Sequence, residues 1–249
     1  MASQIKLGAP VATPPPEEVR DLIGDNDLVV GVDIETHDWE TNAGSKGCVG
    51  QYGFYGRCNS DWAGARVVQL GWATSVGAGE IVVKERLVQP VGFRVSEKAG
   101  RFHGVSHELA TSQGQPLRDV LQEFIQDIIR ALDNGGRIVI HHLEFDAGIL
   151  ARELDRAGLD HFQEAWARIA KAGLCTMDPA IGKWVRTCLG MEIAPYESGN
   201  TMRLDVMLEG LAPESAALAR KRHSAGADAQ LRVILYRALV KLAKRAPTL

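Results

Sequence analysis

Cysteine is scarce in this sequence, and long apolar runs are absent. The four cysteines form no C-x-x-C pair and have no histidine at a zinc-ligand spacing: Cys48, Cys58, Cys175 and Cys188. We therefore expect reduced thiols in an intracellular protein. No apolar run approaches the roughly 20 residues of a membrane span, and residues 1–18 lack the apolar core of a secretory signal. A cytoplasmic location is the default, with nuclear or organellar addresses left open.

The chain also lacks an excess of charge of either sign. Lys and Arg number 28 and Asp and Glu number 31, for a formal charge of −3. This balance gives no whole-protein attraction to nucleic acid, although a local basic face is still compatible with it. The run "ARKRH" (219–223) either contacts phosphates or forms a solvated surface. At 249 residues, with 45% hydrophobic residues, the chain can bury a core without disulfide or metal support.

The chain divides into a short tail and one domain. Residues 1–16 end in "ATPPP", which cannot continue a helix and predicts an extended, mobile tail. Residues 17–249 then form a single domain. It is interrupted at about 37–64 by a glycine-rich loop insertion, and loops of that length are usually functional or disordered.

Strand and helix patterns alternate along the domain. Apolar, β-branched runs predict strands at 27–35, 65–76, 80–90 and 137–142. The second and third are joined by "GAG", which indicates a hairpin. Helical periodicity predicts helices at 16–25, 116–136, 144–158, 201–211 and 225–245. A hairpin followed by strand–helix alternation favours an α/β protein with a mixed sheet covered by helices.

The stretch "GVDIET" places two acids one residue apart in the first predicted strand. Asp33 and Glu35 project from one face, while Val32 and Ile34 point to the opposite face. Neighbouring carboxylates repel and raise each other's pKa unless a cation lies between them. Carboxylates are ligands of Mg²⁺ and Mn²⁺. The alternative is that both acids are solvated at the exposed end of the strand.

Two further segments bring acidic and histidine side chains to element ends. Asp146 lies in the first turn of the helix after the fourth strand, where an acid also complements the helix dipole. In "RHSAGADAQ", His223 precedes Asp228 by five positions, so both can face one cleft. The adjacent His141 and His142 point to opposite faces, so at least one should pack or form a hydrogen bond.

Together these segments resemble the DEDDh family of 3′–5′ exonucleases. The resemblance is carried by "VVGVDIET", "VIHHLEFDAGIL" and "HSAGADA", in that order. Four intervening segments also match in order: "RVVQLGWA", "FHGVSHEL", "LCTMDPA" and "MRLDVMLEGL". The match extends over residues 27–244 of the sequence. Each motif is weak by itself, but three in order with matching spacers are specific.

The resemblance implies an RNase H-like fold, with a mixed five-stranded sheet flanked by helices. It also implies that Asp33, Glu35, Asp146 and Asp228 ligate two Mg²⁺ or Mn²⁺ ions and that His223 is the general base. The implied reaction removes nucleoside 5′-monophosphates from the 3′ end of single-stranded RNA or DNA by a two-metal mechanism.

The resemblance extends to substrate contacts, with departures. Thr36 is kept and His103 falls in the "FHGVSHEL" segment, so both are expected to bind substrate. Trp39 stands in a stretch that differs from the family pattern; it, or the aromatics of residues 52–55, either stacks on a base or packs on the core. Gln69 stands where the family often has Glu, but no metal ligand is expected there.

Other functions remain as alternatives. A catalytically silent nucleic-acid-binding module on the same fold would be expected to have lost one of the five site residues, and all five are present. An RNase H-like endonuclease is a third candidate, against which the His-x4-Asp ending argues. The expected partner is the 3′ end of a single strand; a homodimer is compatible with the resemblance, and no membrane partner is expected.

Overall fold

The computed structural model describes residues 13–38, 64–191, 201–220 and 223–245. Residues 1–12 of the predicted tail and 39–63 of the predicted glycine-rich loop lie outside the described residues. The carbonyl of Thr13 accepts a hydrogen bond from Trp184 Nε1 at 2.9 Å.

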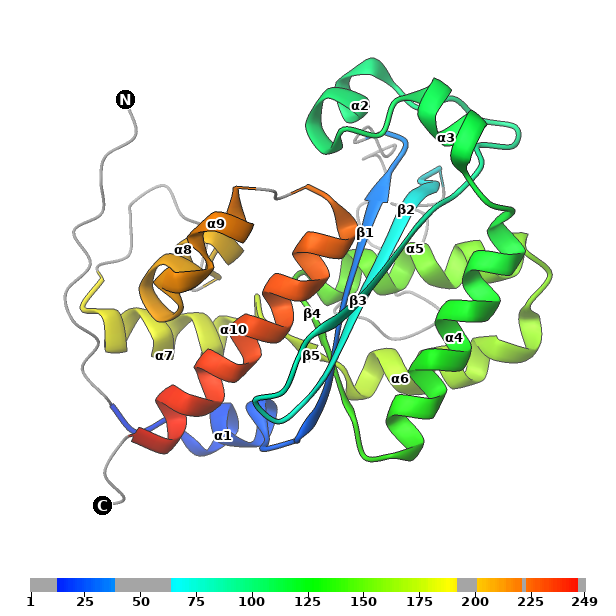
Figure 1. The fold of residues 1–249 in the computed structure, drawn as a ribbon. Helices are drawn as coiled ribbons and strands as arrows, with labels where there is room; N and C mark the ends of the chain where they lie inside the picture. The colour runs from blue at the N-terminus through cyan, green and yellow to red at the C-terminus, as the bar shows by residue number, and fades with distance from the viewer. Residues whose placement is uncertain (1–12, 39–63, 192–200, 221–222, 246–249) are drawn as a thin grey trace, which may run out of the picture.

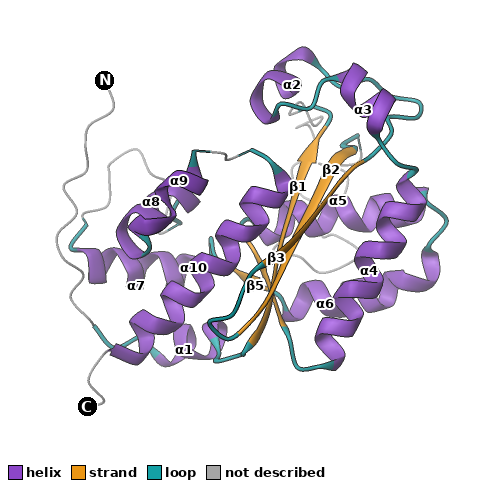
Figure 2. Cartoon of the chain, viewed as in Figure 1, coloured by secondary structure: helices purple, strands orange, loops and turns teal. Residues whose placement is uncertain are grey.

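The centre of the fold is a five-stranded sheet in the order β3-β2-β1-β4-β5 (Figure 2). The central strand β1 (Leu28–Thr36) runs antiparallel to β2 (Val67–Val76) and parallel to β4 (Arg137–Ile140). β2 pairs antiparallel with β3 (Val82–Leu87), and β4 pairs parallel with β5 (Leu174–Cys175). The predicted mixed, five-stranded α/β sheet is confirmed.

One face of the sheet carries a core built from alternate residues of β1. Val30, Val32 and Ile34 point to this face because side chains of a strand alternate between its two sides. Three helices supply most of the residues packed against them: α4 (Leu117–Asp133), α5 (Leu143–Arg156) and α6 (Gln163–Ala172).

The opposite face is covered mainly by α10 (Ala225–Arg245), which runs along β1 and β2 (Figure 1). Its core includes Val29 and Leu235. Three more helices contribute to this layer: α1 (Glu17–Ile23), α7 (Pro179–Leu189) and α8 (Leu204–Leu211). Three short helices complete the described α-helices: α2 (Glu97–His103), α3 (His107–Gln113) and α9 (Ala216–Ala219).

Two glycines let the backbone of α10 touch the sheet directly. A Cβ added at Gly31 would overlap the backbone of Ala229, and one added at Gly71 would overlap the backbone of Ala225. No side chain could fit between strand and helix at these points. The close approach brings the start of α10 within reach of the acids on β1.

The predicted elements agree with the structure to within a few residues. The fourth strand is shorter than predicted, because it ends at Ile140 and His141 and His142 form the following turn. The predicted helix 225–245 matches α10 in both bounds. Among the described residues, no helix combines the length and apolar character needed to cross a bilayer.

Candidate active site

Asp33 and Glu35 lie on the face of β1 that is covered by α10. Both are buried, with 5% and 8% of their surface exposed. Val32 and Ile34 pack in the core of the opposite face, as the alternation of the strand predicts. The interpretation of the two acids as solvated groups at an exposed strand end is therefore wrong.

Asp146 reaches the same region from the other side of β1. It lies in the first turn of α5 and is 3% exposed. The preceding turn is strained: His142 has a φ of 71° in the left-handed region. Of the described non-glycine residues, only His142 and His223 have a positive φ. Both lie just before the helices that carry Asp146 and Asp228, and strain of this kind concentrates at functional sites.

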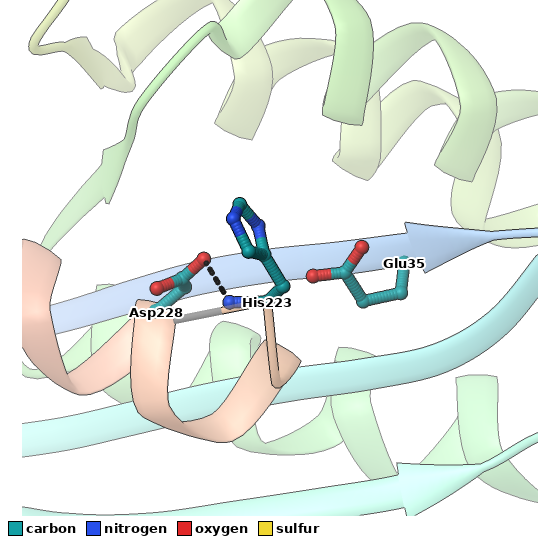
Figure 3. Close-up of side chains that lie close together, drawn as sticks. All are labelled: Glu35, His223 and Asp228. Atoms are coloured by element: carbon teal, nitrogen blue, oxygen red, sulfur yellow. Dashed lines mark hydrogen bonds between the residues drawn. The ribbon is translucent and has the colours of Figure 1, made fainter. Parts of the chain in front are cut away.

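His223, Asp228 and Glu35 converge at the start of α10 (Figure 3). One ligand atom from each lies within 4.8 Å of those of the other two. The backbone N–H of His223 donates to Asp228 Oδ2 at 3.2 Å, which fixes the loop before the helix. The imidazole of His223 packs on Phe102, with 3.7 Å between ring centroids.

A buried arginine that no sequence motif indicated lies among the predicted acids. The guanidinium of Arg232, which is 4% exposed, donates to Asp33 Oδ1 and, at 3.3 Å, to Asp146 Oδ2. It also donates to the carbonyl oxygens of Val32 and, at 3.4 Å, His141. The four acids therefore form two pairs, one bound to arginine and the other beside His223.

Burial, and after it the charges of the neighbouring acids, disfavours the ionised forms of Asp33, Glu35 and Asp146. Burial, followed by the charges of Asp33, Asp228 and Asp146, raises the pKa of Glu35 to about 9. Burial also raises the pKa of Asp33 to about 7, although the Arg232 charge opposes that rise. The pKa of Asp146 is likewise well above its usual range because of burial. A single guanidinium does not compensate this cluster, so additional positive charge would stabilise the ionised acids.

The residues present fit a hard divalent cation. Asp33 Oδ2 and Asp228 Oδ1 are buried and have no hydrogen-bond partner among the described residues. Such orphaned oxygens are costly unless another group satisfies them. Carboxylate oxygens are the donors that Mg²⁺ and Mn²⁺ prefer. The chemistry of the donor set thus agrees with the predicted metal ligands.

Side chains of the hairpin hold the start of α10. Gln69 Oε1 accepts a hydrogen bond from the Ala225 N–H at 2.9 Å. Glu85 Oε2 accepts from the Gly226 N–H at 2.7 Å and from Ser224 Oγ at 2.5 Å. These acceptors satisfy backbone donors that the first turn of a helix leaves unpaired. These contacts of Gln69 and Glu85 therefore position His223 and Asp228, the histidine and the acid of the "HSAGADA" segment.

We expect Glu85→Ala to loosen this attachment. Loss of a helix-capping acceptor costs about 0.5–2 kcal/mol, and loss of support behind functional side chains costs about 10–100-fold in activity. Differential scanning fluorimetry would test the effect on stability. The rate of oligonucleotide degradation, the reaction that the resemblance implies, would test the effect on activity. Glu80→Ala, at an exposed position of the same hairpin, serves as the control. Equal rates for the two variants would exclude a positioning role for Glu85.

Both ring nitrogens of His103, a predicted substrate-binding residue, form hydrogen bonds with backbone groups. Its Nδ1 accepts from the Val105 N–H at 3.1 Å, so Nε2 carries the proton and donates to the Thr36 carbonyl at 3.1 Å. Burial lowers the pKa of His103, which favours this neutral form. His103 thus holds the end of β1 in place. Trp39 and the aromatics of residues 52–55 lie outside the described residues, and so do Lys221 and Arg222 of the basic run.

Two cavities adjoin the site. One, of about 140 Å³, is lined by Glu35, Thr36 and His103 and by two aromatic residues, Phe102 of α2 and Phe145 of α5. The other, of about 610 Å³, lies between α8 and α9 and reaches His223. His223 therefore borders a hollow in the surface.

His141 and His142 have local partners, as predicted for at least one of them. His141 Nδ1 lies 2.8 Å from Thr176 Oγ1, within hydrogen-bond distance. The ring of His142 stacks on Phe145 with 5.7 Å between centroids. Neither belongs to the cluster of candidate ligands in the described part of the chain.

The fold is similar to that of solved exonuclease I structures. E. coli exonuclease I in complex with a dA16 oligonucleotide matches with a TM-score of 0.60 and 13% identity, covering 88% of this chain and 42% of that chain. Exonuclease I from Methylocaldum szegediense matches with a TM-score of 0.58 and 14% identity, covering 88% and 41%. The zinc-bound form of an E. coli exonuclease I–single-stranded DNA complex matches with a TM-score of 0.55 and 14% identity, covering 88% and 41%.

These similarities confirm the predicted RNase H-like fold. The chain spans less than half the length of the exonuclease I chains it matches. No protein-family model matches the sequence, and no curated protein matches it.

Proposed function

We propose that this chain is a metal-dependent 3′–5′ exonuclease of the DEDDh type, acting on single-stranded nucleic acid. The observation that carries the proposal is the convergence of Glu35, His223 and Asp228 within 4.8 Å, beside the pair formed by Asp33 and Asp146. The similar folds support it, because the similar exonuclease I structures include complexes with dA16 and dT13 oligonucleotides and one with single-stranded DNA. Single-stranded DNA is therefore the substrate we favour over RNA.

In this proposal Glu35 and Asp228 would hold a divalent ion, and the unpaired oxygen of Asp33 is available as a further ligand. The resemblance would add a second ion between Asp33 and Asp146. A bound divalent ion supplies electrophilic stabilisation of the phosphoryl oxygens and makes a water nucleophile more acidic. His223 accepts the proton from the attacking water, and its hydrogen bond to Asp228 keeps its backbone in place.

In the proposed complex, the 3′ end of the nucleic-acid strand lies against β1 and α2. The cavity beside Glu35 and Thr36 receives part of the terminal nucleotide, and Phe102, which is 40% exposed, offers an aromatic face. Stacking of a base on such a face contributes about 1–3 kcal/mol. Thr36 and Trp39 remain proposed substrate contacts, while His103 supports the carbonyl of Thr36.

Degradation of an oligonucleotide labelled at its 5′ end tests the proposal. With Mg²⁺ or Mn²⁺ we expect a ladder of products that shortens from the 3′ end. EDTA should reduce the rate at least about 100-fold, because removal of the ion removes several kcal/mol of transition-state stabilisation. A matched RNA strand measured in parallel would determine the preferred sugar.

Two other results would overturn this function. Tight binding of the strand with no shortening, at any divalent concentration, would indicate a silent binding module. Cutting of a circular single strand, which has no 3′ end, would indicate an endonuclease.

A further inference from the structure

We infer that Arg232 takes the place of one of the two divalent cations, so that the chain binds a single ion beside Glu35 and Asp228. The inference rests on the metal-dependent function proposed above and determines how many ions that site holds. It follows from the division of the four acids into two pairs, each with a different basic partner.

The first pair already encloses a positive charge. Arg232 Nη2 contacts Asp33 Oδ1, and Arg232 Nη1 lies 3.3 Å from Asp146 Oδ2. All three side chains are almost fully buried, with 4–7% exposed. An ion shared by Asp33 and Asp146 would lie against this guanidinium, and repulsion between buried cations is strong where water does not screen them.

The arginine is also fixed by the backbone. Its Nη atoms donate to the carbonyl oxygens of Val32 on β1 and His141 in the turn before α5. Moving the guanidinium aside would break these hydrogen bonds as well as its contacts with both carboxylates, and the loss of buried hydrogen bonds is costly. Arg232 is therefore a positioning residue, which holds Asp33 and Asp146 against the backbone of β1 and of the turn before α5.

The second pair retains capacity for an ion. A cluster of candidate ligand atoms is formed by Glu35, Asp228 and His223, and Arg232 is not part of it. Asp228 Oδ1 has no hydrogen-bond partner among the described residues. Asp33 Oδ2 is unpaired in the same way, although Oδ1 of that carboxylate is bound to arginine. The clustered ligand atoms of Glu35, His223 and Asp228 therefore provide one hard-cation site.

Binding of Mn²⁺ alone, without substrate, measures the number of ions. Isothermal titration calorimetry of the full chain should give one Mn²⁺ per chain, and its electron paramagnetic resonance spectrum should lack coupling between neighbouring ions. Arg232→Met should bind two ions and show the coupling. Arg237→Met is the matched control, because Arg237 contacts Ser75 and Gly79 far from the acids, and it should bind one.

A variant of Asp146 keeps the inference testable if Arg232→Met does not fold. With arginine as its partner, Asp146→Asn should still bind one Mn²⁺ with less than a tenfold change in Kd. In a two-ion site the same variant would lose one of two bound ions. Two ions per wild-type chain would overturn the inference, as would loss of Mn²⁺ binding in Asp146→Asn.

The results also separate this inference from the proposed function. One bound Mn²⁺ without strand shortening would refute the exonuclease and leave the single-ion site standing. Two bound ions with 3′–5′ shortening would support the exonuclease and refute the role of Arg232.

Discussion

Asp228→Asn is expected to lower strand degradation by about 10³-fold, which corresponds to a loss of about 4 kcal/mol of transition-state stabilisation. The substitution keeps the size of the side chain and an oxygen that can accept the hydrogen bond from the His223 N–H. In the parent this bond joins His223 N and Asp228 Oδ2 at 3.2 Å. It removes the negative charge that we propose holds the ion. The rate of strand degradation by the variant and by the parent, measured at saturating Mn²⁺, tests this expectation.

The same variant should be more stable than the parent when no metal is present. The charge of Asp228 raises the pKa of both Glu35 and Asp33, so it disfavours their ionised forms in the folded protein. Each 1 kcal/mol gained by its removal would raise Tm by about 2–4 °C in a domain of this size. Lower activity together with higher stability is the usual signature of a functional charge cluster.

Asp21→Asn provides the comparison, because Asp21 is an exposed acid on α1. Its rate and Tm should equal those of the parent. If Asp228→Asn retained more than a tenth of the parental rate, Asp228 would not be a ligand of the essential ion.

Gly71→Val is expected to produce the largest loss of stability. A Cβ at this position would lie 2.2 Å from backbone atoms of Ala225 and 2.4 Å from the Gly226 nitrogen. The added atom meets helix backbone, so no side-chain rearrangement relieves the clash. Overpacking of this severity costs about 3 kcal/mol or more, which predicts a fall in Tm of about 6–12 °C.

Activity should fall with stability in this variant, because a displaced α10 carries His223 and Asp228 away from Glu35. Gly64→Val is the control, since a Cβ at Gly64 meets no atom within 4 Å. Thermal unfolding followed by circular dichroism, with rates measured below the transition, distinguishes the effects. A parental Tm in Gly71→Val would mean that α10 does not rest on β2 as described.

The parts of the site that follow local periodicity were predictable from the sequence. The alternation of β1 placed Asp33 and Glu35 on one face, and the strand-to-helix junction placed Asp146 in a first turn. The spacing of His223 and Asp228 likewise implied a loop residue followed by a helical one. In each case the rule depends on a few consecutive residues, so the tertiary structure was not needed.

Arg232 shows where local rules were insufficient. A signal was present: it lies four residues after Asp228 and thus on the same side of α10. Burial could not be inferred, because an arginine is usually exposed and Arg237 on the same helix is only half-buried. The contacts of Gln69 and Glu85 with the start of α10 join residues more than 130 positions apart, and no local pattern encodes them.

The placement of α10 has a consequence for the order of folding events. Its N-terminal half contacts β1 across 199 positions, from Arg232 to Asp33, and β2 across 156 positions, from Ala225 to Gln69. Until these contacts form, the acids of β1 lack both their arginine and their neighbours His223 and Asp228. Because contacts between residues so far apart in sequence form slowly, we expect the acidic cluster to assemble late in folding.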